Sequence, residues 1–253
     1  MTEVVFAGPS LFGLENSVRR GIELRPPARS GDLLDAVMGG ATTIGLVDGV
    51  FGFVPSVWHK EILVGLDSGV RILGAASMGA LRAAECSAFG MEGLGRIFED
   101  YRDGVRWADA DVAVLHAPAE LDFQPLTIAL ADIDATVQSL RAMEKLSAES
   151  AAAVHAAARG VNFRERTWET VLDLSVLGQV ERRHTAELVE EHFVSQKQQD
   201  CKLLIEQMKA SRSRRSTASL MTEGPLNRTD VLVRLEHQVK KSRKRTAAAR
   251  TSA

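Results

Sequence analysis

Short apolar runs that alternate with helical patterns constrain the fold of the first half of this chain. The apolar runs are rich in β-forming residues and lie at 3–8, 42–49, 70–75 and 111–116. The helical patterns lie at 10–21, 30–40, 56–69, 78–90 and 94–104. The connection at 23–29 contains two prolines, which bar it from regular helix. Strand and helix in alternation predict an α/β fold, with a parallel sheet of three to four strands and flanking helices.

The pattern changes beyond Pro118, where helical periodicity takes over. Segments 126–160 and 163–178 are helical, and 181–210 reads as one long helix with an apolar face and Lys, Gln and Glu on the other. We therefore expect an α/β core over 1–120 that contains the active site. A helical region over 121–210 follows it.

The last segment, 211–253, is expected to be a basic and flexible tail. It holds eleven Lys and Arg against three Asp and Glu, a net charge of +8, although the whole chain has a net charge of −2. A short amphipathic stretch at 229–239 follows a polar basic linker, and 240–253 has nothing to bury, so we expect it to be disordered. The tail lacks interleaved aromatic residues, which makes nucleic acid an unlikely partner. An acidic protein is an alternative partner for it.

Several classes of protein are excluded by composition. The N-terminal segment has an acid at Glu3 and no basic region, and no apolar run approaches the ~18 residues that span a bilayer, so we expect a cytoplasmic protein without membrane contact. Cys86 and Cys201 lie far apart and form neither a disulfide framework nor a metal-ligand spacing. No metal site and no cofactor are predicted.

The turn after the 70–75 run, Ala75-Ala76-Ser77-Met78-Gly79, allows three interpretations. Ser77 could cap the following helix with its hydroxyl. The turn could belong to a dinucleotide fingerprint, but Ala76 replaces the glycine that must approach a pyrophosphate. It could also be a nucleophile elbow, in which a serine on a sharp strand-to-helix turn lies near helix amides that bind an oxyanion.

A nucleophilic serine needs a base, and the preceding unit offers three candidates. Asp48 follows the 42–49 run, and His59 and Lys60 lie at the start of the next helical pattern. In a parallel sheet these loops can converge on the edge where Ser77 lies. His59 and Lys60 are about 100° apart on a helix, so we do not expect both to face one serine.

Long motifs in this region resemble those of the TfuA-like family. They include Val-Pro-Ser-Val-Trp-His-Lys-Glu-Ile-Leu at 54–63 and Ala-Ala-Ser-Met-Gly-Ala-Leu-Arg-Ala-Ala-Glu at 75–85, and the resemblance covers roughly the first 120 residues. It implies a protein that acts with a YcaO-type, ATP-dependent enzyme in peptide backbone thioamidation. The implied reaction is hydrolysis of the C-terminal thiocarboxylate of a ThiS-like sulfur carrier, which delivers sulfide. The implied partners are the YcaO-type enzyme, the carrier and, through the enzyme, a precursor or protein substrate peptide.

The same resemblance implies a Ser-Lys pair formed by Ser77 and Lys60. The amides of Met78 and Gly79 would bind the oxyanion, and His59, Asp48 and Arg82 are secondary candidates. We expect Arg82 to pair with Glu85, three residues on. An acyl-enzyme on Ser77 and direct attack by a water that Lys60 activates both remain possible. The alternative function is a non-catalytic adaptor that recruits the YcaO-type enzyme, its peptide and the carrier.

Overall fold

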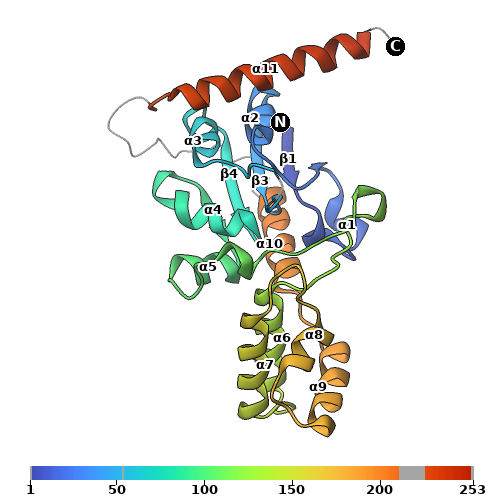
Figure 1. Ribbon diagram of the computed structural model, residues 1–253. Coiled ribbons are helices and arrows are strands. Elements are labelled where there is room, and N and C mark those ends of the chain that lie inside the picture. The colour runs from blue at the N-terminus through green and yellow to red at the C-terminus, as the bar shows by residue number, and fades with distance from the viewer. Residues whose placement is uncertain (1, 53, 211–225, 252–253) are drawn as a thin grey trace.

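The computed structural model describes residues 2–52, 54–210 and 226–251. Figure 1 shows a central sheet with its covering helices, a helical bundle below it and a long C-terminal helix across the top. The basic linker predicted from the sequence lies mostly within 211–225, outside the described residues.

A parallel five-stranded sheet forms the centre of the molecule and confirms the predicted α/β class. Its strands are β1 (Thr2–Phe6), β2 (Glu23–Arg25), β3 (Ala41–Leu46), β4 (Arg71–Ala75) and β5 (Glu92–Leu94). Their order is β2-β1-β3-β4-β5, and every pair is parallel. The direction of winding reverses between β1 and β3, and crevices at such reversals hold ligands in open α/β sheets.

Two strands were not predicted, and one predicted strand is absent. β2 forms at 23–25, directly before Pro26 and Pro27. A proline favours extended backbone in the residue that precedes it, so the two prolines bar a helix there but permit a strand that ends before them. β5 is a short edge strand of three residues before the helix that begins at Arg96. The apolar run at 111–116 forms a loop that begins in the 3-10 turn η3 (Asp109–Asp111). Its apolar residues Val112 and Ala113 are nevertheless buried.

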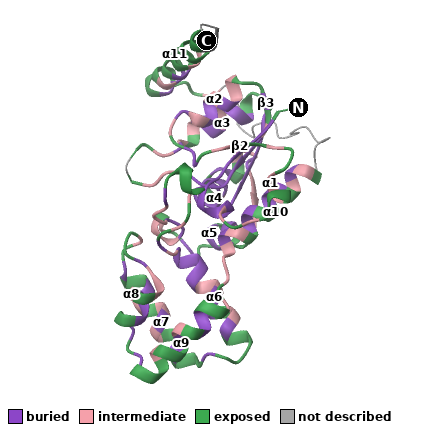
Figure 2. Ribbon diagram, turned by 90° about the vertical axis from the view of Figure 1, so that its right-hand side faces the viewer, coloured by how far each residue is buried: buried purple, intermediate pink, exposed green. Residues whose placement is uncertain are grey.

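Helices cover both faces of the sheet because alternate strand residues point to opposite sides. Val4, Phe6, Ile44 and Ile72 point to one face, where they pack with residues of α2, α3, α4 and α5. Val5, Val47 and Leu73 point to the other face, which α10 covers. Figure 2 shows the buried strands between these layers. The helices of these layers are α1 (Asn16–Arg19), α2 (Asp32–Met38), α3 (His59–Asp67), α4 (Met78–Cys86), α5 (Arg96–Arg102) and α10 (Gln196–Ala210).

The bundle contains α6 (Leu130–Ala142), α7 (Ala148–Gly160), α8 (Trp168–Leu174) and α9 (Gln179–Glu191) around a core of its own. The long helix predicted over 181–210 is wrong, because the chain breaks at 192–195 into α9 and α10. Ser195 starts the second helix, since its Oγ accepts a hydrogen bond from Gln198 N at 3.2 Å. The break lets α10 leave the bundle and return to the sheet.

The C-terminal helix α11 (Asp230–Thr251) extends through most of the segment expected to be disordered, so that expectation is wrong for the described residues 240–251. Leu232, Leu235 and Val239 pack with Leu34 of α2, and the Arg243 guanidinium pairs with Asp35 at 2.9 Å. Anchored by these contacts, the helix continues beyond the body (Figure 1). None of the helices in the described part of the chain is long and apolar enough to cross a membrane.

A buried carboxyl joins α2 to α3. Glu61 is fully buried and accepts hydrogen bonds from Gly31 N at 2.8 Å and Trp58 N at 3.2 Å. Burial raises the pKa of Glu61 to about 7. Because the pKa of Glu61 is higher in the folded protein than in the unfolded chain, the folded state keeps a proton that the unfolded chain releases. The free energy of unfolding therefore has its full value below the unfolded pKa and decreases as the pH rises through the folded pKa.

We therefore expect the free energy of unfolding to fall by about 3 kcal/mol between about pH 4.5 and about pH 8 because of Glu61. Urea unfolding across this range measures it. Glu61→Gln should flatten the pH dependence, and the matched control Glu120→Gln, an exposed position, should keep the wild-type profile. Equal slopes in wild type and Glu61→Gln would contradict the assignment.

Candidate active site

Ser77 lies on a tight turn between β4 and α4. Ala76 has a φ of 67°, a left-handed conformation that residues other than glycine seldom adopt. The Ser77 amide donates to the Ala75 carbonyl at 2.8 Å, and Ala75 and Ala76 are fully buried. Backbone strain of this kind is concentrated at functional sites, so the turn fits the predicted nucleophile elbow.

The Ser77 hydroxyl does not cap the helix, although Ser77 occupies the N-cap position of α4. Its Oγ instead donates to the Val112 carbonyl at 3.4 Å. This observation removes the simplest interpretation of the serine, in which the hydroxyl serves only the first turn of its own helix.

Only one of the two amides predicted for the oxyanion is available. The Gly79 amide donates to the Val47 carbonyl at 3.0 Å and is therefore occupied. The Met78 amide has no acceptor among the described residues and lies at the N-terminus of α4, directly after Ser77. Met78 N is thus the amide that can bind an oxyanion.

The structure does not bring Lys60 together with Ser77. Lys60 Nζ donates to the Asn227 carbonyl at 3.0 Å, and no hydrogen bond or ion pair joins it to Ser77 in the described residues. α3 begins beside the middle of α4, because Arg82 Nε donates to the Val57 carbonyl at 3.0 Å. Arg82 is five residues after Ser77, about 7.5 Å along the helix. The contact that the segment before α3 makes with α4 is therefore to Arg82.

His59 and Arg82 meet at one carboxylate away from Ser77. The Glu85 carboxylate contacts Arg82 Nη1 at 2.6 Å and His59 Nε2 at 2.7 Å. The predicted pairing of Arg82 with Glu85 is confirmed. This cluster fastens α3 to α4 and leaves neither side chain at the serine.

Asp48 lies at the carboxyl edge of the sheet, as predicted, and clamps the loop that follows β1. One carboxylate oxygen accepts from Gly8 N at 2.8 Å and Ser10 N at 3.0 Å, and the other accepts from Ser10 Oγ at 2.8 Å. Asp48 Oδ1 also lies 3.8 Å from Lys197 Nζ, and both residues are buried. Asp48 therefore has a partner that the sequence did not indicate.

Lys197 is the lysine that reaches the Ser77 turn. Its Nζ donates to the Val112 carbonyl at 2.9 Å, so Ser77 and Lys197 share one acceptor oxygen. Ser77 comes from the end of β4, Asp48 from the end of β3 and Lys197 from the first turn of α10. The structure therefore assembles a buried serine, lysine and aspartate at the β1/β3 reversal.

A signal for Lys197 was present in the sequence. The buried residues of α10 are Lys197, Asp200, Cys201, Leu204, Ile205 and Met208, and Lys197 is the one basic residue among them. A lysine in line with an apolar stripe is unusual, since lysine is almost never fully buried without a partner. Because one continuous helix with its lysines on the exposed face was predicted over 181–210, the burial of Lys197 was not predicted.

Asp132 of α6 adds a second carboxyl beside Lys197. Asp132 Oδ1 accepts from the Lys197 amide at 3.0 Å, and Ser195 Oγ donates to its other oxygen at 3.4 Å. Burial raises the pKa of Asp132 to about 6, which the nearby Lys197 charge partly opposes. Sequence reasoning did not identify Asp132, because its role depends on where α10 begins.

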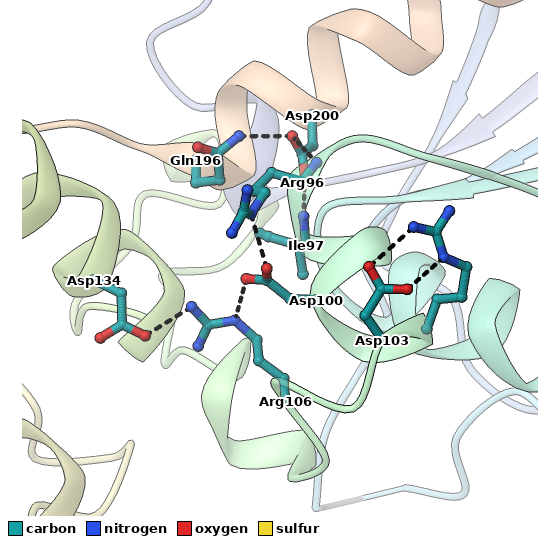
Figure 3. Close-up of polar contacts among 9 residues, drawn as sticks. Arg96, Ile97, Asp100, Asp103, Arg106, Asp134, Gln196 and Asp200 are labelled. Carbon is teal, nitrogen blue, oxygen red and sulfur yellow. Dashed lines mark hydrogen bonds and ion pairs between the residues drawn. The ribbon is translucent and has the colours of Figure 1, made fainter.

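Hydrogen bonds to Asp200 fasten α10 to α5, and ion pairs of Arg106 join α5 to α6 (Figure 3). Asp200 accepts from the amides of Arg96 and Ile97 at the start of α5, at 3.1 and 2.8 Å. Arg106 bridges Asp100 of α5 at 3.1 Å and Asp134 of α6 at 2.7 Å. These contacts join α5 of the sheet layer to α10 and to the first helix of the bundle.

Both cysteines are buried. Burial raises the pKa of Cys86 to about 11 and that of Cys201 well above its usual value. Neither thiol forms a disulfide. Within the described residues, no group of three or more His, Cys, Asp or Glu could hold a metal ion.

Comparison with known proteins supports the resemblance found in the sequence. One family model, described as TfuA-like protein, matches residues 48–167. The match begins at Asp48 and includes Ser77, Lys60 and Val112, whereas Lys197 lies beyond its end. No curated protein matches the chain.

Proposed function

The chain belongs to the TfuA-like family, and from this premise we propose that it is a hydrolase that acts with a YcaO-type enzyme in peptide backbone thioamidation. Its substrate is the C-terminal thiocarboxylate of a ThiS-like carrier, and its product is sulfide for the partner enzyme. The observation that supports the proposal is the meeting of Ser77 and Lys197 on the Val112 carbonyl. This pair takes the place of the Ser77 and Lys60 pair that the resemblance implied.

In the proposed reaction Lys197 moves two protons. Its ammonium attracts the thiocarboxylate anion and protonates the sulfur, which leaves a neutral amine. The amine takes the proton of Ser77 Oγ as that oxygen attacks the carbonyl carbon. The tetrahedral oxyanion is bound by Met78 N, and its collapse breaks the C–S bond and releases hydrosulfide. Water then cleaves the Ser77 ester and yields the carrier carboxylate and a proton.

Asp48 is a positioning residue in this proposal. Its carboxylate lies 3.8 Å from Lys197 Nζ and is fixed by the loop that follows β1. The ion pair orients the Lys197 ammonium that receives the substrate. It also keeps Nζ beside the Val112 carbonyl.

Substrate must displace Val112 to reach the serine. Ser77 is only 2% exposed, and the Val112 carbonyl lies between its Oγ and Lys197 Nζ. The substrate carbonyl takes this position when the loop around Val112 moves. In this proposal the docking of a partner protein moves that loop, which links hydrolysis to the presence of the partner.

Covalent trapping tests the proposal. Thiocarboxylated carrier is mixed with the chain and quenched in acid, and intact-mass spectrometry then measures the adduct while a sulfide probe follows release. We expect sulfide together with a carrier-sized adduct that maps to Ser77 and is absent in Ser77→Ala. Sulfide without an adduct would favour direct attack by water. Partner binding without sulfide from any form would contradict hydrolysis and favour the adaptor.

A further inference from the structure

A large groove lies beside Lys197, between the bundle and the sheet layer. Its volume is about 1000 Å³, which is at the upper end for ligand sites in proteins. The groove is lined by the loop after β1, by the 124–128 segment and by α8, α9 and the start of α10. We call it the bundle groove.

One face of α9 follows the bundle groove along its length. Gln179, Arg183, Ala186 and Glu190 line it, and Phe193 lines it just beyond the helix. From Gln179 to Phe193 the helical rise gives roughly 20 Å. An extended peptide advances about 3.3 Å per residue, so a groove of this length accommodates about six residues.

The walls of the bundle groove are apolar and partly open. Leu126 and Phe193 line it and are 57% and 45% exposed, and Trp168 and Ile128 line it as well. Exposed aliphatic and aromatic side chains that face a common cavity favour an occupant with apolar side chains.

The part of the bundle groove beside α10 is polar, and Lys197 and Asp132 contribute one charge of each sign to it. Lys197, Ser195 and Gln198 line it there, and Lys197 Nζ contacts the same Val112 carbonyl as Ser77. An extended peptide complements this arrangement when its apolar side chains lie along the walls and its terminal group reaches the Lys197 ammonium, which lies at the Ser77 turn.

We propose that the bundle groove binds the extended C-terminal segment of the acyl-bearing carrier, and that it selects segments with apolar side chains within about six residues of the terminus. This inference rests on the proposed function for the identity of the occupant. It adds a determinant of specificity outside the Ser77 turn, formed by Leu126, Ala186 and Phe193.

Peptide binding tests the inference without turnover. Fluorescein-labelled hexapeptides that end in glycine are titrated with the full chain, and fluorescence polarisation is measured. One peptide has leucine and phenylalanine upstream, one has only serine and glycine, and one is the apolar peptide with a C-terminal amide. We expect the apolar carboxylate peptide to bind tightest, by about tenfold over each of the others.

Two variants should weaken binding of the apolar peptide by about tenfold or more. Ala186→Trp fills the middle of the bundle groove, and Leu126→Asp places a charge on its wall without disturbing a core residue. The matched control Leu121→Asp changes a leucine that is 59% exposed and does not line the groove, so it should bind as wild type does. Thermal unfolding confirms that each variant is folded.

The outcomes separate the two proposals. Absence of peptide binding, or equal binding by Leu126→Asp and Leu121→Asp, would overturn the groove assignment even if Ser77 forms an ester with the carrier. Groove-dependent binding without any sulfide release would support the groove assignment as a peptide site. In that case the hydrolase proposal would fail.

Discussion

Replacing Lys197 with methionine is expected to lower sulfide release from thiocarboxylated carrier by about 100-fold or more, the usual range for loss of a general acid–base group. The physical reason is the position of Nζ, 2.9 Å from the carbonyl that Ser77 Oγ also contacts. Lys60→Met should change the rate by less than about threefold, because Lys60 Nζ contacts Asn227 at the start of the segment that leads into α11. Single-turnover sulfide release measures both variants.

A structural effect of Lys197 must be separated from a chemical one. Methionine removes the charge that faces Asp48, whereas Lys197→Arg keeps a cation that cannot lose its proton at neutral pH. If proton transfer is the role of Lys197, both variants lose activity, while the arginine variant retains more of the wild-type stability in urea. Full activity in Lys197→Arg, or a large loss in Lys60→Met alone, would contradict the pairing of Ser77 with Lys197.

The α/β class and the strand-to-helix turn at Ser77 could be predicted because both depend on local signals. Apolar runs over β1, β3 and β4 alternate with helical patterns, and the Ala75–Gly79 turn has the small residues that a strand-to-helix elbow needs. Asp48 was placed correctly at the carboxyl edge, since that edge is common to all strands of a parallel sheet. Local periodicity was sufficient for these conclusions.

The proposed partner of Ser77 could not be found in the same way, because Lys197 is distant in the chain. Lys197 reaches the site only because the helix predicted over 181–210 breaks at Ser195 and returns to the sheet. The break depends on long-range contacts, such as the hydrogen bond from Lys197 N to Asp132 Oδ1. The residues near Ser77 left Asp48, His59 and Lys60 open as candidates, and the resemblance implied Lys60; the contact of Lys197 with the Val112 carbonyl depends on folding and has no local signal around Ser77.

Edge and terminal elements were missed for a related reason. β5 has only three residues, too few for a clear strand pattern. The apolar segment around Val112 is buried without being a strand, so its apolar residues led to a wrong strand prediction. The basic residues after 239 have no apolar face, yet they continue a helix whose first half is fixed to α2 by Leu232 and Val239. Such helices depend more on their anchoring contacts than on their own propensity.

Gly79 is expected to tolerate no side chain, and Gly79→Ala should lower the free energy of unfolding by about 3 kcal/mol or more. A Cβ at this position would lie 1.8 Å from the Leu46 carbonyl oxygen and 2.6 Å from its carbon. Both are backbone atoms of β3 and cannot rotate away, so α4 must move off the sheet. That movement would break the hydrogen bond from Gly79 N to the Val47 carbonyl and displace Ser77 from Val112.

Gly160 supplies the matched control for this substitution. A Cβ there meets no atom within 4 Å, and its φ lies outside the left-handed region. Gly160→Ala should therefore be neutral or stabilise α7 by up to about 1 kcal/mol, through helix propensity. Urea unfolding compares the two variants, and the trapping experiment reports whether Ser77 still forms its ester. If Gly79→Ala were as stable and as active as Gly160→Ala, the close approach of α4 to β3 would not be what positions the serine.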